Sequence, residues 1–203
     1  MRKLHRASFM TIPYIATVVG LWMMQNAWAA MLIYHVLVLI VARHEIRPTL
    51  KRKKLNRLEW AAVAAALCGG PGLYFLWPMI GGEQAALAER MAFFGLTGGS
   101  LLFFVLWFSI IHPVLEESLW RSLDPKPWQL FCGQDLCFAG YHGLVVFWFV
   151  QPIWIAVSLV VLVSSSMFWR WLTWKTGSRW PAFAMHAAAD ASILVGIAVL
   201  SSR

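Results

Sequence analysis

Six side chains able to take part in acid–base chemistry interrupt apolar sequence in the second half of this chain. An ionised group at membrane depth is costly, so such groups are usually paired, turned inward and functional. Carboxylates and imidazoles can take a proton from water and can stabilise a negatively charged oxygen. Their presence makes an enzyme the leading hypothesis. The six residues are Glu116, Glu117, Arg121, His142, His186 and Asp190.

Helical spacing assigns different roles to the two adjacent glutamates. Glu117 and Arg121 are four residues apart with the acid first, which is the favourable direction for an ion pair on one helix face. Glu116 points about 100° away from that face. We therefore expect Glu116 to lack the arginine partner and to be free to take a proton from water.

The remaining polar groups also follow helical spacing. His186 and Asp190 are four residues apart, as are Phe138 and His142, so each pair shares a helix face. The ring of Phe138 can then pack while the imidazole of His142 points into a cleft. Three helices with one polar face each predict a common site, open to the cytoplasmic half of a helical bundle.

The composition places these groups in a membrane protein. Of the 203 residues, 60% are hydrophobic and 13% are charged, and the mean hydropathy is +0.65. A soluble domain of this length would carry more charge, and several apolar runs approach the length of a membrane span. The sequence therefore predicts an all-α, polytopic transmembrane bundle with about seven spans, the last three to four of which form a catalytic core.

Turn signals divide this bundle into two regions. Residues 1–98 are expected to form an N-terminal transmembrane region, and residues 99–203 the catalytic core. A loop outside the membrane is expected over 81–90. The predicted helical segments are a hairpin over 8–42 that turns at Gln25 and Asn26, a third span over 58–80 interrupted at 69–72, a long helix over 99–123, and helices over 128–150, 153–172 and 181–200.

The formal charge of +8 indicates contact with a membrane surface rather than nucleic-acid binding. Seven basic residues lie within 43–57, between apolar spans, where the positive-inside rule predicts a cytoplasmic loop on anionic lipid. No aromatic or glycine pattern of a nucleic-acid module accompanies them. The size and the basic loop favour a bacterial inner membrane, with the N-terminus and the opening of the site on the cytoplasmic side.

Three further polar residues have structural interpretations. His112 is four residues before Glu116, but Pro113 stands between them, so a structural role is favoured. His35 is expected to form a hydrogen bond to a neighbouring helix. Asp135 is expected to cap the start of the helix that carries His142.

The three polar motifs together resemble a known family. Their order is similar to that of the CPBP intramembrane proteases, which include the CAAX prenyl endopeptidases and bacteriocin-processing or immunity proteins. The similarity covers residues 99–200. The motifs are Glu116-Glu117-Ser118-Leu119-Trp120-Arg121, Phe138-Ala139-Gly140-Tyr141-His142 and His186-Ala187-Ala188-Ala189-Asp190.

This resemblance implies a glutamate-type endopeptidase that cuts a membrane-associated protein or peptide near its C-terminus. Glu116 with His142 would activate water, and His186 with Asp190 would stabilise the oxyanion. No cofactor is implied. The residues that would organise the site are Glu117, Arg121 and Phe138.

Two positions depart from the family pattern. Ser122 replaces the glycine that commonly follows the arginine. Asp190 stands where asparagine is the usual oxyanion donor. An ionised Asp190 would repel an oxyanion, so it must be protonated or must act by orienting His186.

Other functions remain open from the sequence. Glu116, His142 and His186, with Asp190, are an acceptable zinc set, although no His-Glu-x-x-His helix is present and the resemblance favours a metal-free enzyme. A non-catalytic immunity or binding protein would retain the same polar core. Buried acids and histidines also mark ion paths, but no inverted repeat supports a transporter.

Overall fold

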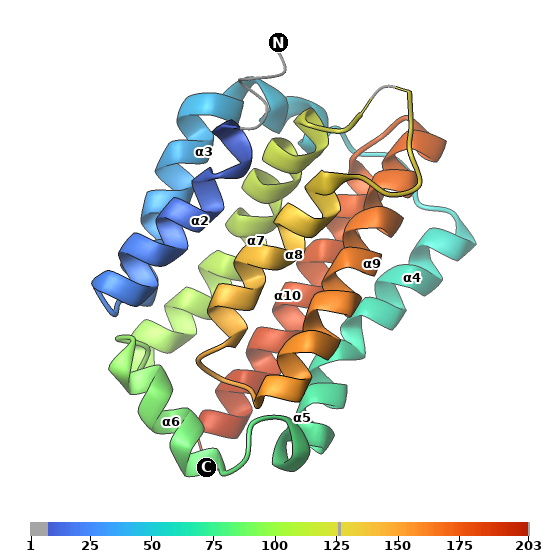
Figure 1. Ribbon diagram of the computed structural model, residues 1–203. Coiled ribbons are helices and arrows are strands. Elements are labelled where there is room, and N and C mark those ends of the chain that lie inside the picture. Colours follow the sequence, from blue (N-terminus) through green and yellow to red (C-terminus); the bar gives the residue numbers. More distant parts are fainter. Residues whose placement is uncertain (1–7, 126, 203) are drawn as a thin grey trace.

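The chain forms a bundle of helices in the computed structural model, which describes residues 8–125 and 127–202 (Figure 1). Every regular element in those residues is helical, and none is a strand. The all-α prediction is therefore confirmed.

The first helical segments form the predicted hairpin. α2 (Ile12–Ala16) continues into a π-helical segment, η1 (Thr17–Met23), and α3 (Ala27–Leu50) runs back beside them. The chain reverses at Gln25, whose φ of 52° lies in the left-handed region. Asn26 then caps α3, because its side chain accepts a hydrogen bond from a backbone amide in the first turn. The predicted turn is confirmed.

The basic segment 43–57 is not the loop that the charge pattern predicts. α3 continues through its first half to Leu50, and only residues 51–56 lie outside helices. Arginine is a good helix former, so scattered basic residues do not end a helix. The helix ends where four basic residues follow one another at 51–54 and repel.

The third span is interrupted as expected. α4 (Arg57–Leu67) and α5 (Gly69–Ile80) follow one another with a break at Cys68. Gly70 lies against the last helix of the chain: a Cβ there would lie 2.0 Å from the backbone oxygen of Ser192. The Gly70 amide donates to the Ser192 hydroxyl at 2.7 Å. Glycine therefore permits a close backbone approach at this point.

A short helix replaces most of the outer loop predicted over 81–90. α6 covers Gln84–Phe93. Leu87 and Met91, four residues apart, are both buried. This apolar spacing gives the segment a face that packs on the bundle, which is why it is helical rather than an open loop.

The second half of the chain contains four helices. α7 (Gly98–Ser122), α9 (Pro152–Thr176) and α10 (Trp180–Ser201) agree closely with the predicted segments. α8 (Gly133–Val146) has only 14 residues, so the span predicted over 128–150 is too long. α7 packs against α3 and α10, and α8 packs against α9.

A buried ion pair explains the late start of α8. Arg170 Nη2 lies 2.6 Å from Asp135 Oδ2, and the same carboxylate accepts from the Cys132 amide at 3.0 Å. Asp135 thus caps the helix, as predicted. Arg170 also donates to the carbonyl oxygens of Gln129 and Leu130, so the approach to α8 has its hydrogen bonds satisfied without being helical.

Helix length supports five membrane spans. The predicted count of seven is not confirmed, because α8 and the helical stretch Ser8–Met23 are shorter than the others. The five segments that are long and apolar enough are Ala27–Leu50, Arg57–Ile80, Gly98–Ser122, Pro152–Thr176 and Trp180–Ser201.

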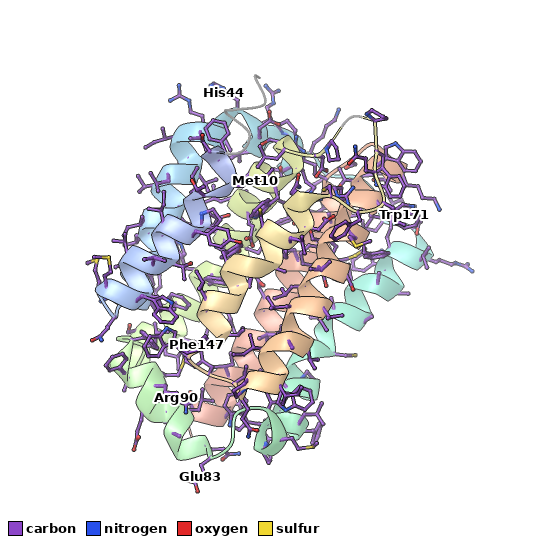
Figure 2. The ribbon with its side chains drawn as sticks, in the orientation of Figure 1. Met10, His44, Glu83, Arg90, Phe147 and Trp171 are labelled. Carbon is purple, nitrogen blue, oxygen red and sulfur yellow. The ribbon has the colours of Figure 1, made fainter. Side chains whose placement is uncertain are left out.

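The two ends of the bundle differ in charge. His44 and Trp171 lie at one end, while Glu83 and Arg90 lie at the other (Figure 2). The first end also carries the basic residues of 43–57 and 170–179, so we call it the basic end. The strongly basic linker between α3 and α4 is part of it (Figure 1).

Candidate active site

Glu116 lies on α7 in the interior of the bundle, with no exposed surface. Its Oε2 is 3.1 Å from Nε2 of His112 and 3.2 Å from Nε2 of His186. Glu116 forms no ion pair with Arg121, as expected, but two imidazoles take the place of that partner. The His112 imidazole comes from the preceding turn of α7, and the His186 imidazole comes from α10. The spacing of residues within α7 cannot predict the second contact.

The second carboxylate oxygen of Glu116 also has two neighbours. Oε1 accepts from the Trp120 indole N–H at 3.2 Å and from the Tyr141 hydroxyl. That hydroxyl lies 3.1 Å from Nε2 of His142. Because no nitrogen of His142 comes within 4.0 Å of the carboxylate, Tyr141 connects the two predicted catalytic residues.

The hydrogen bonds of His142 fix its tautomer when it is neutral. Its Nδ1 lies 2.8 Å from the carbonyl oxygen of Phe138. A carbonyl only accepts, so Nδ1 carries a hydrogen, and the single hydroxyl hydrogen of Tyr141 is donated either to Glu116 or to Nε2 but not to both. The Phe138 ring also packs against the imidazole, with a centroid separation of 4.7 Å.

His186 lies between the two glutamates. Its Nε2 faces Glu116, and its Nδ1 lies 3.0 Å from Oε1 of Glu117. Both ring nitrogens thus face carboxylate oxygens, an arrangement in which the imidazolium form donates on both sides. Glu117 Oε2 lies 3.1 Å from Arg121 Nε, so the predicted ion pair is confirmed.

Asp190 stands at the edge of this cluster. Its Oδ2 is 3.6 Å from Nε2 of His186, which is too long for a direct hydrogen bond. Within the described residues, Oδ2 has no hydrogen-bond partner. The side chain is 18% exposed, whereas the carboxylate of Glu116 is fully buried.

A chain of hydrogen bonds behind Glu116 was not foreseen. The Trp107 indole, which can only donate, lies 3.2 Å from Nδ1 of His35. His35 then carries its hydrogen on Nε2 and donates to Nδ1 of His112, also at 3.2 Å. His112 is left with its hydrogen on Nε2, the nitrogen that lies 3.1 Å from Oε2 of Glu116. The prediction that His35 contacts a neighbouring helix is confirmed.

His112 contacts Glu116 directly, although the intervening proline favours a structural role for it in the sequence. Its separation of four residues from Glu116 was visible, but Pro113 made the geometry uncertain. The structure keeps Pro113 within the helix, so the two side chains still share a face. Tyr141 was missed because nothing in its spacing distinguishes it from a packing residue.

The members of the site differ in how deeply they are buried. Glu116, Glu117 and His186 are buried, and Glu116 lines neither of two cavities at the basic end. His142 and Asp190 are only partly buried. The site is closed around Glu116 and reaches the surface through its two outer members.

The residues do not assemble the zinc set considered from the sequence. No group of three histidine, cysteine or acidic side chains in the described part of the chain is arranged to hold a metal ion. Tyr141 stands between Glu116 and His142, so these two side chains do not converge with His186 on one point.

Comparison with known families bears on the same segment. Residues 98–192 match the family described as Type II CAAX prenyl endopeptidase Rce1-like. A comparison with curated proteins finds no match, and a comparison with solved structures finds none. The matched segment contains α7, α8, α9 and the part of α10 that carries His186 and Asp190. Residues 98–192 are thus similar to the Rce1-like CAAX prenyl endopeptidases, which is consistent with the CPBP resemblance of the three motifs.

Proposed function

We propose that this protein is an intramembrane endopeptidase that hydrolyses a peptide bond near the C-terminus of a membrane-associated protein or peptide. The observation that carries the proposal is the position of Glu116 Oε2 between the imidazoles of His112 and His186. The two histidines come from different helices of the family segment. A carboxylate held by two imidazoles is suited to take a proton from water.

The proposed reaction uses one acid and two imidazoles. Glu116 takes a proton from water, and the water oxygen attacks the scissile carbonyl carbon. The oxyanion that forms is stabilised by the protonated His186, while His142 assists Glu116 through the Tyr141 hydroxyl. The carbon–nitrogen bond then breaks, and the proton held by Glu116 passes to the leaving amine. Asp190 stays near His186 and helps to keep it charged.

The burial pattern supports a direction of approach to the site. His142 on α8 and Asp190 on α10 are the members with exposed surface. We propose that substrate and water enter between these two helices, from the membrane side. The basic end would then face the cytoplasm of a bacterium, with the chain in its inner membrane.

The decisive experiment compares the wild-type protein with Glu116→Gln in liposomes. The probe is an internally quenched peptide ending in a farnesylated Cys-aliphatic-aliphatic-X sequence, and the same peptide without the lipid tests the need for it. We expect Glu116→Gln to lose at least a hundredfold in kcat/KM. A variant with unchanged thermal unfolding and wild-type cleavage would overturn the proposal.

Metal dependence is tested in the same assay. We propose a metal-free reaction, because the donor set does not converge. Cleavage should therefore survive dialysis against a chelator. Loss of activity on chelation, with recovery on adding zinc, would favour the metal-dependent alternative.

A non-catalytic immunity or binding function is the second candidate. The observation that favours it is the complete burial of Glu116, with its oxygens in contact with four side chains. Asp190 at the usual asparagine position points the same way. Such a protein would cleave neither peptide, and Glu116→Gln would not change its immunity or binding function.

A further inference from the structure

A cavity of about 620 Å³ lies at the basic end of the bundle, apart from Glu116 and the histidines. It is open on one side and is lined by the linker between α3 and α4, the end of α7, the loop before α8, the end of α9 and the residues that follow it. Its lining includes Lys51, Arg52, Lys53, Arg121, Trp128 and Thr173.

Apart from Arg121 Nε, which pairs with Glu117, three buried polar atoms of the lining residues lack an internal partner. Arg121 Nη2, Trp128 Nε1 and Thr173 Oγ1 are buried, yet none has a hydrogen-bond partner within residues 8–125 and 127–202. The first two can only donate. A buried donor left without an acceptor is costly, so three that line one cavity indicate a ligand that brings acceptor oxygens.

The charge of the cavity lining indicates the charge of that ligand. Lys51, Arg52 and Lys53 form no ion pair with an acidic side chain in the part of the chain described. Asp124 lines the cavity too, but it is held by Arg121. The lining therefore carries uncompensated positive charge, which favours an anion.

The position of the cavity indicates where such an anion would come from. It lies at the ends of two predicted membrane spans, α7 and α9. Trp128 stacks on Trp174 at 5.3 Å, and Trp174 is 61% exposed. Tryptophan beside basic residues is typical of the membrane–water interface, where lipid phosphates are the abundant anions.

We propose that this cavity binds the phosphate of an anionic phospholipid headgroup. Donors from three separate segments suit a group with oxygens on several sides. Arg121 lines the cavity, and its Nε lies 3.1 Å from Oε2 of Glu117. The site does not depend on peptidase activity.

Native mass spectrometry of the detergent-purified full chain tests the proposal. The probes are phosphatidylglycerol, zwitterionic phosphatidylcholine and inorganic phosphate alone. We expect one phosphatidylglycerol to bind per chain, at least tenfold more tightly than phosphatidylcholine. Binding of inorganic phosphate without phosphatidylglycerol would overturn the lipid assignment. Equal binding of the two lipids would do the same.

Two substitutions remove a donor without changing charge. Thr173→Val and Trp128→Phe should each weaken phosphatidylglycerol binding about tenfold, because each removes a hydrogen bond to a charged group. Thr11→Val and Trp171→Phe make the same changes at residues that do not line the cavity, and should leave binding unchanged. Wild-type affinity in both cavity variants would overturn the proposal.

Neighbouring lysines provide a charge-matched pair. Lys53 lines the cavity and Lys54 does not, although both are exposed. Lys53→Gln should weaken binding about fivefold, as expected for one lysine near a lipid phosphate. Lys54→Gln should have a smaller effect. Equal effects would show diffuse attraction to the basic surface and not a defined site. Thermal unfolding of each variant verifies that it is folded.

Discussion

At the scale of single residues, the environment of Glu116 depends on the Trp107 indole, which is connected to it through His35 and His112. The Trp107 indole fixes the hydrogen of His35, which fixes that of His112 on Nε2, 3.1 Å from Oε2 of the carboxylate. Each step follows from the donor and acceptor capacity of the groups. Glu116 is thereby held as an acceptor, which is the state that a general base requires.

Tyr141 offers the sharpest test of this arrangement. Tyr141→Phe removes the hydroxyl that contacts both Glu116 and His142, so we expect kcat to fall roughly tenfold to a hundredfold with little change in KM. The pH profile of kcat/KM should shift as well, since the carboxylate loses a donor. Peptide cleavage in liposomes measures both effects.

Tyr14→Phe is the matched control for that substitution. The Tyr14 hydroxyl donates to the carbonyl of Cys137, one turn before Tyr141 on α8, and contacts neither Glu116 nor His142. If the fall in kcat came only from looser packing of α8, it would appear in both variants. Equal kinetics for Tyr14→Phe and Tyr141→Phe would contradict a positioning role for Tyr141.

At the scale of elements, the ion pair of Asp135 and Arg170 determines where α8 begins. Arg170→Gln leaves the Asp135 charge buried and frees the carbonyls of Gln129 and Leu130, so the free energy of unfolding should fall by about 3–5 kcal/mol. Unfolding in mixed micelles at increasing denaturant measures this change.

Two further variants separate the causes. Adding Asp135→Asn to Arg170→Gln should recover part of the loss, because no unpaired charge then remains buried. Arg179→Gln breaks a partly exposed pair with Glu45 and should cost less than about 1 kcal/mol. A single variant as stable as the wild type would contradict the assigned role of Arg170.

The contact between α5 and α10 has a built-in comparison of two glycines. Gly70→Ala places a methyl group against the backbone of Ser192, so the free energy of unfolding should fall by about 1–3 kcal/mol or more. Gly72→Ala, in the same helix, meets nothing within 4 Å and should be neutral or stabilising by about 1 kcal/mol. Thermal unfolding in detergent ranks the two, and the reverse order would contradict the packing.

At the scale of the whole molecule, the basic end is expected to face the cytoplasm. With the native cysteines replaced, Lys54→Cys should react with an impermeant maleimide only after the cells are permeabilised. Glu83→Cys, at the opposite end (Figure 2), should react in intact cells. The opposite labelling pattern would reverse the proposed orientation and place the anion cavity outside.

Much of the architecture is local and was predictable. The apolar runs, the turn at Gln25 and Asn26, and the pairing of Glu117 with Arg121 all depend on residues close in sequence. Backbone hydrogen bonding sets the helical repeat, so a spacing of four residues gives the same geometry in any fold. The sequence by itself therefore determined the helices and which polar groups share a face.

Only the tertiary structure decided which groups meet across helices. His186 lies between two glutamates because α10 packs on α7 in one register, and Tyr141 rather than His142 contacts Glu116 because of the rotation of α8. Axial shift and rotation are set by the packing of many side chains at once, so no local spacing encodes them. The closure of the site around Glu116 has the same origin.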